Sequence, residues 1–584
     1  MGPLAATRDL VKRFGTGEAA LGGVSIAIEP GRITGLVGPD GAGKTTLIRL
    51  LTGLLQADGG TIEVLGGAAG AALDQIGYMP QRFGLYEDLS VRENLTLYAE
   101  LRGLPRDERE RVFDRLLAFT DLGRFQTRLA GKLSGGMKQK LGLACALVRT
   151  PRLLLLDEPG VGVDPVSRRE LWAMVRELAG SDAGDGGVGV LWSTAYLDEA
   201  ERCDRVHLLD RGKLLFSGPP AELTGRIADR SFRLVDYAGE RRRLLERVLD
   251  REDVADAAIQ GHAIRLLVAR DAPVPAVAEL GAGTAARLEA VPPRFEDGFI
   301  DILGGGPGGT SALAEAYRAI PPSDAPAIEA RGLTKRFGDF TAAEAMEFTI
   351  ARGEIFGLLG PNGAGKSTTF KMLCGLLKPS AGTGSVAGFD LRHAAADARG
   401  ALGYMAQKFS LYGDLSVQEN LDFFAGVYGL DRRAARTAIG RMIETFDLSR
   451  FLSANAGTLP LGYKQRLALA CSVMHEPPVL FLDEPTSGVD PITRREFWTH
   501  INGLVGKGVT VLVTTHFMDE AEYCDRIALI YRAREIAIGT PDELKALAAA
   551  ETPDSLGDPT MEDAFIALIE ASDRAREAHE RQAA

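Results

Sequence analysis

The chain has 584 residues, 45% of them hydrophobic, and its formal net charge is −12 at pH 7. A chain of this length is too long for a single hydrophobic core and predicts roughly three or four domains. The negative net charge argues against a general nucleic-acid binder, because binding to nucleic acid favours a basic surface. We find no secretory signal and no apolar run near the roughly 18 residues of a membrane helix, so we expect a soluble, cytoplasmic protein.

The first distinctive stretch is residues 38–46, which read Gly-Pro-Asp-Gly-Ala-Gly-Lys-Thr-Thr after the apolar run 33–37. Glycines in such a turn let backbone N–H groups point at an anion, while the lysine and the hydroxyl can reach the outer phosphates and Mg²⁺. The helix that follows adds its positive N-terminal end. The stretch therefore predicts a phosphate-binding loop between a strand and a helix.

A second feature of the first half is the apolar run 153–156, which ends in Asp157 and Glu158. An unbroken apolar run of this length suits a strand covered on both faces of a parallel sheet, and its carboxyl end is where open α/β sheets bind ligands. A last strand, expected over 188–194, leads into a helix that begins Leu-Asp-Glu-Ala. Strands and helices alternate throughout, as in α/β domains.

The middle of the chain has a pattern of its own. Strand-like runs at 232–235, 264–268 and 287–291 alternate with helical runs at 241–249 and 275–280. This predicts a small α/β accessory domain. The stretch that follows contains glycines and prolines and predicts a flexible linker.

The pattern of the first half then recurs. A second phosphate loop, 360–369, reads Gly-Pro-Asn-Gly-Ala-Gly-Lys-Ser-Thr-Thr, and the apolar run 479–482 ends in Asp483 and Glu484. The chain is thus an internal duplication of α/β domains. The expected boundaries are 1–225 for the first domain, 226–303 for the accessory domain, 304–326 for the linker, 327–545 for the second domain and 546–584 for the C-terminal tail.

The string 133–139, Leu-Ser-Gly-Gly-Met-Lys-Gln, lies just before the first acidic pair. Its small residues open a helix whose N-terminus can donate backbone N–H groups to a phosphate. The phosphate loop, the Gln81 or Gln407 segment, this string and the Asp-Glu strand occur in the same order in both halves. In this combination the chain resembles the ATP-binding cassette (ABC) family, and the resemblance covers both repeats.

The resemblance implies an ATPase with two cassettes packed head to tail, each ATP lying between the phosphate loop of one cassette and the signature helix of the other. Glu158 and Glu484 would polarise the attacking water, the general-base role in phosphoryl transfer, and His516 would contact the γ-phosphate. The residues implied to bind ATP are Phe14, Gly38, Gly41, Gly43, Lys44, Thr45, Thr46, Ser134, Gly135, Gly136, Phe337, Gly360, Asn362, Gly363, Gly365, Lys366, Ser367 and Thr368. Those implied to meet Mg²⁺ or its water are Thr45, Gln81, Asp157, Ser367, Gln407 and Asp483.

The two halves differ within this set. Ala195 replaces the His516 type, Pro460 and Leu461 replace the Ser-Gly of the first signature, and Asp40 replaces the Asn362 type. Proline offers no N–H, and a leucine side chain stands where the backbone should approach closely. In the implied sandwich all these changes fall in the site built on Lys44. We expect one competent site on Lys366 and one impaired site that mainly holds nucleotide; the alternative, that both sites turn over, stays open because Glu158 is kept.

The closing phrases Phe-Glu-Asp-Gly-Phe at 295–299 and Met-Glu-Asp-Ala-Phe at 561–565, with the Leu-Pro-Leu-Gly second signature, resemble the cytosolic subunits of ABC-2-type exporters, which include drug and antibiotic efflux systems. The resemblance implies a peripheral ATPase on the inner face of the cell membrane. It would energise export by separate permease subunits, which would dock near the Gln81 and Gln407 loops.

A rival interpretation is a tandem-cassette translation factor that acts on the ribosome. Such proteins usually have two intact signatures and a long charged helical linker between the cassettes. This chain has one degenerate signature, an α/β insertion in place of that linker, and an acidic balance, so the exporter interpretation is preferred and no nucleic-acid partner is expected.

Overall fold

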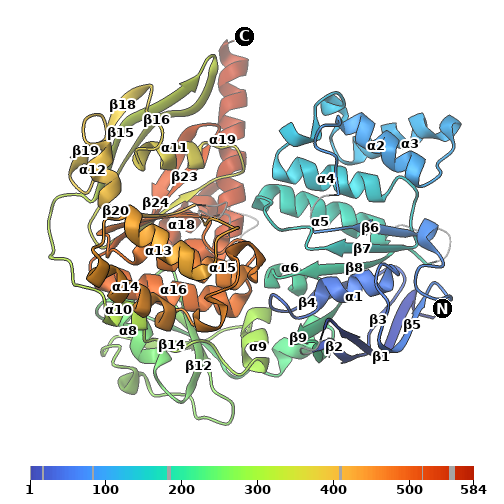
Figure 1. Cartoon of the computed structure of the whole chain (residues 1–584), viewed down its shortest axis with the longest axis horizontal. Helices are drawn as coiled ribbons and strands as arrows, with labels where there is room; N and C mark the ends of the chain where they lie inside the picture. The colour runs from blue at the N-terminus through green and yellow to red at the C-terminus, as the bar shows by residue number, and fades with distance from the viewer. Residues whose placement is uncertain are drawn as a thin grey trace. The chain divides into compact units, whose positions relative to one another are not determined.

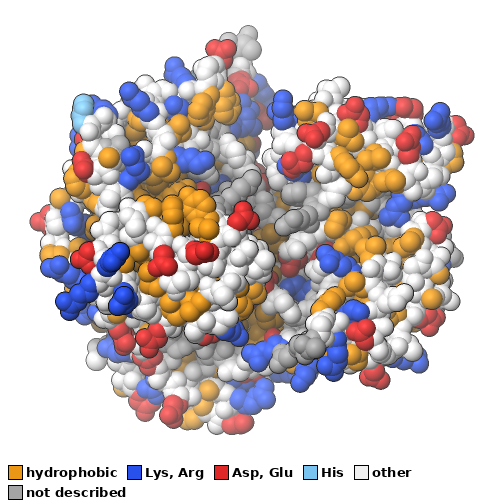
Figure 2. Space-filling model, in the orientation of Figure 1, with side chains coloured by type: hydrophobic (Ala, Val, Ile, Leu, Met, Phe, Trp, Pro, Cys, Tyr) orange, Lys and Arg blue, Asp and Glu red, His pale blue; other side chains and the backbone are white. Residues whose placement is uncertain are grey.

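The computed structural model describes residues 2–15, 19–81, 84–180, 186–406, 411–515, 517–551 and 559–583. The chain divides into two compact units (Figure 1). The first comprises Met1–Asp229, Pro292–Leu303 and Gly488–Pro491, and the second comprises Arg230–Val291, Gly304–Ser487 and Ile492–Ala584. Basic and acidic side chains are interspersed over the face of the molecule shown in Figure 2.

The first unit is built on a six-stranded sheet in the order β10-β9-β4-β8-β7-β6, in which only the β9–β10 pair is antiparallel. The strands are β4 (Ile33–Val37), β6 (Ile76–Met79), β7 (Leu153–Asp157), β8 (Gly189–Thr194), β9 (Arg205–Asp210) and β10 (Lys213–Gly218). Every residue of β4 and β7 is buried. Burial on both faces explains the unbroken apolar runs in the sequence.

A smaller antiparallel sheet and the helices complete this unit. The sheet has the order β2-β1-β3, with β5 also paired to β1; its strands are β1 (Ala5–Arg13), β2 (Ala19–Val24), β3 (Ala27–Ile28) and β5 (Gly59–Val64). The helices are α1 (Lys44–Leu51), α2 (Val91–Leu101), α3 (Arg106–Phe119), α4 (Gly135–Ala146), α5 (Pro165–Gly180), α6 (Leu197–Glu201), α7 (Pro220–Gly225) and α9 (Phe295–Ile302). One buried cluster joins Leu47 and Ile48 of α1 to residues of both sheets, so the core lies directly beneath the phosphate loop.

The second cassette repeats this topology within the second unit. Its main sheet has the order β20-β21-β22-β17-β23-β24, the same arrangement followed from the opposite edge. The strands are β17 (Ile355–Leu359), β20 (Leu402–Met405), β21 (Val479–Asp483), β22 (Thr510–Thr514), β23 (Arg526–Tyr531) and β24 (Arg534–Gly539), and the smaller sheet contains β15 (Ile328–Phe337), β16 (Phe340–Ile350), β18 (Ala381–Val386) and β19 (Phe389–Asp390). The helices are α11 (Lys366–Leu373), α12 (Ala395–Gly400), α13 (Val417–Val427), α14 (Arg432–Thr445), α15 (Leu461–Val473), α16 (Pro491–Gly506), α17 (Met518–Ala521), α18 (Pro541–Glu551) and α19 (Met561–Ala583). The predicted α/β class with two tandem repeats is confirmed.

The accessory segment forms an antiparallel sheet in the order β12-β13-β11-β14, with helix α8 packed on β12. Its elements are β11 (Ser231–Val235), α8 (Arg241–Leu249), β12 (Val254–Gln260), β13 (Ala263–Val268) and β14 (Arg287–Ala290). The helical run expected over 275–280 is only a short 3₁₀ turn, Val277–Leu280. The sequence pattern also missed β12, because its alanines carry little strand preference.

The compact units do not follow the domain boundaries expected from the sequence. Helix α9 packs on α6 and α7 and belongs to the first unit, because Phe295 and Phe299, one turn apart on one face, are fully buried. Residues 304–326 belong to the second unit and include α10 (Ala312–Glu315). Tyr317 is buried there and its Oη donates to the Pro477 carbonyl at 2.8 Å, so this part of the expected flexible linker is anchored.

Candidate nucleotide-binding sites

Each phosphate loop joins the end of a central strand to the start of a helix. Residues 38–43 connect β4 to α1, and residues 360–365 connect β17 to α11. Gly43 and Gly365 precede the helices with φ of 104° and 112°, a left-handed conformation that glycine adopts without a steric penalty. The first backbone N–H groups of α1 and α11 therefore lie at the loop without helical partners, as an anion site requires.

A buried lysine lies at the centre of each loop. Lys44 Nζ donates to the carbonyls of Gly38 at 2.7 Å and Pro39 at 3.2 Å. Lys366 Nζ makes the same two bonds, to the carbonyls of residues 360 and 361, at 2.5 and 3.0 Å. Both lysines are 5% exposed. An ammonium held this way presents positive charge to whatever occupies the loop, which suits a polyphosphate.

A carboxylate ends the strand beside each loop. Thr45 Oγ1 donates to Asp157 Oδ1 at 3.2 Å, and Asp157 Oδ2 is buried without a hydrogen-bond partner among the described residues. In the second unit, Thr514 Oγ1 donates to Asp483 Oδ1 at 2.5 Å. Burial raises the pKa of both aspartates. The unpartnered carboxylate oxygen beside a hydroxyl in the first unit is a set of hard oxygen donors that fits Mg²⁺.

The glutamates that follow have strained backbones. Glu158 and Glu484 have φ of 52° and 50°, a region that non-glycine residues rarely occupy and that is often found at functional sites. Backbone bonds fix them there: the Glu158 N–H donates to the Ser193 carbonyl at 3.0 Å, and the Glu484 N–H donates to the Thr514 carbonyl at 2.9 Å. In the first unit Gln81 Nε2 donates to Glu158 Oε2 at 2.5 Å. The glutamine predicted to contact Mg²⁺ is therefore hydrogen-bonded to the glutamate predicted to act as general base.

A buried glutamate shapes the loop that follows β8 in the first unit and β22 in the second. Thr194 Oγ1 donates to Glu199 Oε2 at 2.6 Å and accepts from the Tyr196 N–H at 2.9 Å. Thr515 and Glu520 repeat the arrangement, with the Phe517 N–H as donor. Burial raises the pKa of Glu199 to about 7, and Arg168 opposes that rise. In the first unit the residue between the threonine and the aromatic side chain is the buried Ala195.

The two signature helices begin differently. Ser134 is the N-cap of α4, and its hydroxyl accepts from the Met137 N–H at 3.3 Å. Pro460 occupies that position before α15 and makes no side-chain cap. Gly135 and Gly136 form the first turn of α4, whereas α15 starts with the leucine of the degenerate signature. The predicted difference between the signatures is therefore also a difference in how the helices are capped.

The aromatic rings expected to stack on adenine are exposed at the ends of matching strands. Phe14 is 56% exposed and Phe337 is 51% exposed. Lys12 Nζ lies 5.6 Å from the centre of the Phe14 ring, and Lys335 Nζ lies 5.0 Å from that of Phe337. An exposed ring with a cation on one face has its other face available for a base.

The phosphate loop, the aspartate and the glutamate lie at one edge of the main sheet in each unit. The remaining predicted loop residues, Gly41, Thr46, Asn362, Gly363, Ser367 and Thr368, lie in these loops and the first turns of α1 and α11. The signature residues open α4, which packs on α2 and α5. Gln407 and His516 lie outside the described residues.

Sequence reasoning missed two sets of residues. Glu199 and Glu520 were assigned no role, although the repeated Asp-Glu-Ala after each last strand was a signal for them. Asp204 and Asp525 were also unassigned, although each follows a cysteine and precedes an arginine in both halves. Repetition of a polar phrase in both halves was the usable signal: it follows β8 or β22 for the glutamates and directly precedes β9 or β23 for the aspartates.

The comparisons with known proteins agree with this geometry. A family model described as ABC transporter matches residues 21–161 and 343–487. The chain is 56% identical over 574 residues to the probable multidrug ABC transporter ATP-binding protein YbhF of Escherichia coli (strain K12), covering 97% of each chain. It is 44% identical over 218 residues to the Nod factor export ATP-binding protein I of Burkholderia lata, covering 37% of this chain and 72% of that protein. It is 42% identical over 221 residues to the daunorubicin resistance ATP-binding protein DrrA3 of Streptomyces coeruleorubidus, covering 38% of this chain and 70% of that protein.

Two features therefore agree: repeated phosphate loops that each adjoin a carboxylate-ended strand, and a match that extends over nearly the whole chain. The chain belongs to the ABC transporter family and is an ATPase made of two tandem cassettes.

Proposed function

We propose that this ATPase energises export through separate membrane subunits of the ABC-2 type, in a drug or antibiotic efflux system. The observation that carries the proposal is the full-length similarity to a probable multidrug ABC transporter ATP-binding protein. Shorter relatives named for Nod factor export and daunorubicin resistance point to the same class of transport. Within the described residues, no helix combines the length and hydropathy of a membrane span. The membrane pathway is then supplied by partner chains, with this chain on the inner face of the membrane.

We further propose that only one of the two composite sites hydrolyses ATP efficiently. That site contains Lys366, Glu484 and His516, together with the signature of α4 that Ser134 caps. Lys366 binds the outer phosphates, Glu484 orients and deprotonates the attacking water, and His516 contacts the γ-phosphate. Mg²⁺, held by Ser367, Gln407 and Asp483, would neutralise charge that develops on the phosphates.

The other composite site combines Lys44 with the signature that begins at Pro460. Its loop has Ala195 in place of a histidine, and its α15 has no side-chain cap. Thr45, Gln81 and Asp157 still offer ligands to Mg²⁺. This site accordingly retains nucleotide. The charge-assisted contact that is lost at Ala195 would contribute about 1.5–3 kcal/mol to the transition state, and its loss slows hydrolysis at this site more than tenfold.

The docking surface for the membrane subunits includes the segments after Gln81 and Gln407. Tyr86 and Tyr412 lie in these segments and are 55% and 50% exposed. In both, the backbone N–H of the tyrosine donates to an asparagine of the following helix. The backbone is therefore fixed while the ring stays at the surface, which suits contact with a partner.

Affinity capture of the tagged chain from gently solubilised cells tests this proposal. Stoichiometric recovery of polytopic membrane proteins is expected, and it should be lost in a Tyr86→Asp/Tyr412→Asp variant. Leu215→Asp, at a 39% exposed position on β10, is the matched control and should retain the partners. Recovery of ribosomal proteins with no membrane protein would contradict the exporter proposal and leave only the ATPase assignment.

A further inference from the structure

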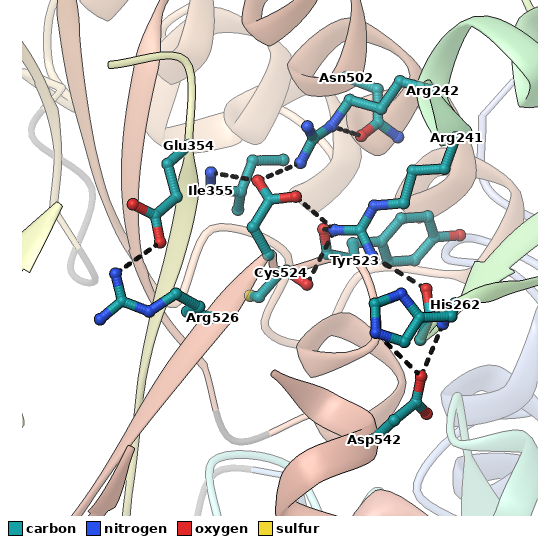
Figure 3. A network of polar contacts seen from close by, with 12 residues as sticks. Arg241, Arg242, His262, Glu354, Ile355, Asn502, Tyr523, Cys524, Arg526 and Asp542 are labelled. Atoms are coloured by element: carbon teal, nitrogen blue, oxygen red, sulfur yellow. Dashed lines mark hydrogen bonds and ion pairs between the residues drawn. The ribbon is translucent and has the colours of Figure 1, made fainter. Parts of the chain in front are cut away.

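The accessory segment is fastened to the second cassette by two adjacent arginines of α8 (Figure 3). Arg241 Nη2 donates to Asp525 Oδ1 at 2.6 Å, and Arg242 Nη2 donates to Asp525 Oδ2 at 2.5 Å. Their side chains are 13% and 9% exposed. Arg241 also donates to the Cys524 carbonyl at 2.9 Å, and Arg242 Nε donates to Asn502 Oδ1 at 3.2 Å. Charged hydrogen bonds of this kind are among the stronger ones in proteins.

The carboxylate of Asp525 also holds the strand that leads to the second phosphate loop. Its Oδ2 accepts from the Ile355 N–H at 2.8 Å, and its own N–H donates to the Ile355 carbonyl at 2.8 Å. Ile355 is the first residue of β17, and β17 ends directly before the loop that contains Lys366. A contact at Asp525 therefore acts on the base of the strand that positions Lys366.

The first cassette has the same arrangement but supplies its own arginine. Asp204 Oδ2 accepts from the Ile33 N–H at 2.8 Å at the base of β4. Arg176 of α5 donates to both oxygens of Asp204, at 2.9 and 2.8 Å. No residue of the accessory segment takes part in these bonds.

The second cassette lacks that arginine. Arg176 and Asn502 each lie eleven residues after the proline that begins α5 or α16. An asparagine cannot neutralise a carboxylate. Arg242 contacts both Asn502 and Asp525, so it reaches the position that the arginine of the first cassette occupies.

Two other contacts fix the accessory segment on the same cassette. The His262 N–H donates to Asp542 Oδ2 at 2.8 Å at the start of α18, and Arg495 Nη2 lies 3.4 Å from Asp256 Oδ2. Gly261 is required beside Asp542, because a Cβ there would lie 2.3 Å from the carboxylate. These contacts place α8 so that its arginines meet Asp525 and not solvent.

We infer that Arg241 and Arg242 are positioning residues for the Lys366 site: the accessory domain supplies the cation that the second cassette has lost, and so holds β17 and its phosphate loop. The inference rests on the proposal that Lys366 binds nucleotide. It assigns the accessory domain a part in ATP binding by the second cassette. The first cassette, which has Arg176, does not need it.

Hydrogen exchange of the full-length protein, followed by mass spectrometry, tests this directly. In Arg241→Ala/Arg242→Ala, amides of β17 should exchange at least tenfold faster, while those of β4 keep their rate. Adding Asn502→Arg should restore slow exchange in β17, because an arginine at this position can pair with Asp525 as Arg176 pairs with Asp204 in the first cassette. Arg243→Ala is the matched control, since Arg243 is 75% exposed and pairs with Glu240 at the N-cap of the same helix.

Nucleotide affinity gives the second readout. In a Lys44→Ala background, which reports the Lys366 site alone, the double arginine variant should bind a fluorescent ATP analogue about tenfold more weakly, and Asn502→Arg should recover the affinity. Unchanged exchange in β17, equal acceleration in β4, or failure of Asn502→Arg to rescue would each overturn the inference. If Lys366→Ala leaves affinity unaltered in that background, the proposed function fails instead, and exchange in β17 still decides the role of the arginines.

Discussion

Lys44 Nζ lies 3.5 Å from Glu158 Oε1, and the two side chains are 5% and 6% exposed. Gln81 donates to the other oxygen of the same carboxylate. The glutamate of the first cassette is thus engaged by a cation and an amide of its own unit.

The proposal that only the Lys366 site hydrolyses ATP efficiently predicts unequal effects of matched substitutions at Glu484 and Glu158. Glu484→Gln should lower ATP turnover at least a hundredfold, the usual range for loss of a general base. Glu158→Gln should lower it by less than about threefold, since the proposed Lys44 site contributes little turnover. Steady-state phosphate release of the two variants, with nucleotide occupancy measured in parallel, checks the prediction. Equal losses would show that both sites hydrolyse ATP.

A charge swap in the phosphate loops should change affinity in opposite directions. Burial raises the pKa of Asp40 to about 6, with the Lys44 charge opposing and the Glu158 charge adding to that rise. As pH rises through 6, Asp40 ionises and repels the phosphates, so affinity at the Lys44 site should fall more steeply than in Asp40→Asn. At pH 8, Asp40→Asn should bind roughly tenfold more tightly, and Asn362→Asp should weaken the Lys366 site. Calorimetric titration between pH 5.5 and 8 measures both, and parallel pH curves for wild type and Asp40→Asn would contradict it.

A substitution at the N-cap of α4 should lower stability and ATP turnover, whereas a substitution at the start of α15 should have little effect. Ser134→Ala removes a hydrogen bond to the first turn and should cost about 1 kcal/mol of stability, and it should reduce hydrolysis because this signature serves the competent site. Pro460→Ala removes no cap and should leave turnover within about twofold of wild type. Denaturant unfolding and phosphate release compare the pair. A larger effect of Pro460→Ala on turnover would mean that the degenerate signature serves the site that works.

Acid should destabilise the second cassette through His500. Burial lowers the pKa of His500 to about 4, and the Arg466 charge lowers it further; its Nδ1 lies 3.0 Å from Ser311 Oγ of the expected linker. Between pH 6.5 and 4 the unfolded chain binds a proton at His500 more readily than the folded chain does. The free energy of unfolding is therefore unaffected by His500 above pH 6.5, and it falls as the pH is lowered, by about 3 kcal/mol at pH 4. His500→Gln should remove that part of the pH dependence in thermal unfolding, whereas a substitution at the exposed His579 should not. A His500→Gln curve that parallels wild type would contradict the assignment.

Much of the fold was predictable because buried parallel strands produce continuous apolar runs. The run 479–482 and the acidic pair after it placed β21 and its ligand-facing end, and the glycine-rich loops placed Lys44 and Lys366. These are local signals, in which a few neighbouring residues determine the backbone.

Contacts between distant segments left no such signal. Arg242 and Asp525 are 283 residues apart, and nothing near either one reveals the other. The burial of Phe295 and Phe299 likewise assigns α9 to the first unit although the sequence groups it with the accessory segment. Tertiary packing determines both arrangements, and contacts between residues this far apart cannot be inferred from local patterns in a single sequence.

The accessory segment lies in the chain between two parts of the first unit, yet it packs within the second. Cutting the chain after residue 303 would separate Arg242 from Asp525, and cutting it before residue 230 would separate α9 from α6 and α7. Neither cut releases two complete halves. Two separate polypeptides, one per cassette, would each lack contacts that the single chain makes, so continuity of the chain is itself part of how the two cassettes are stabilised.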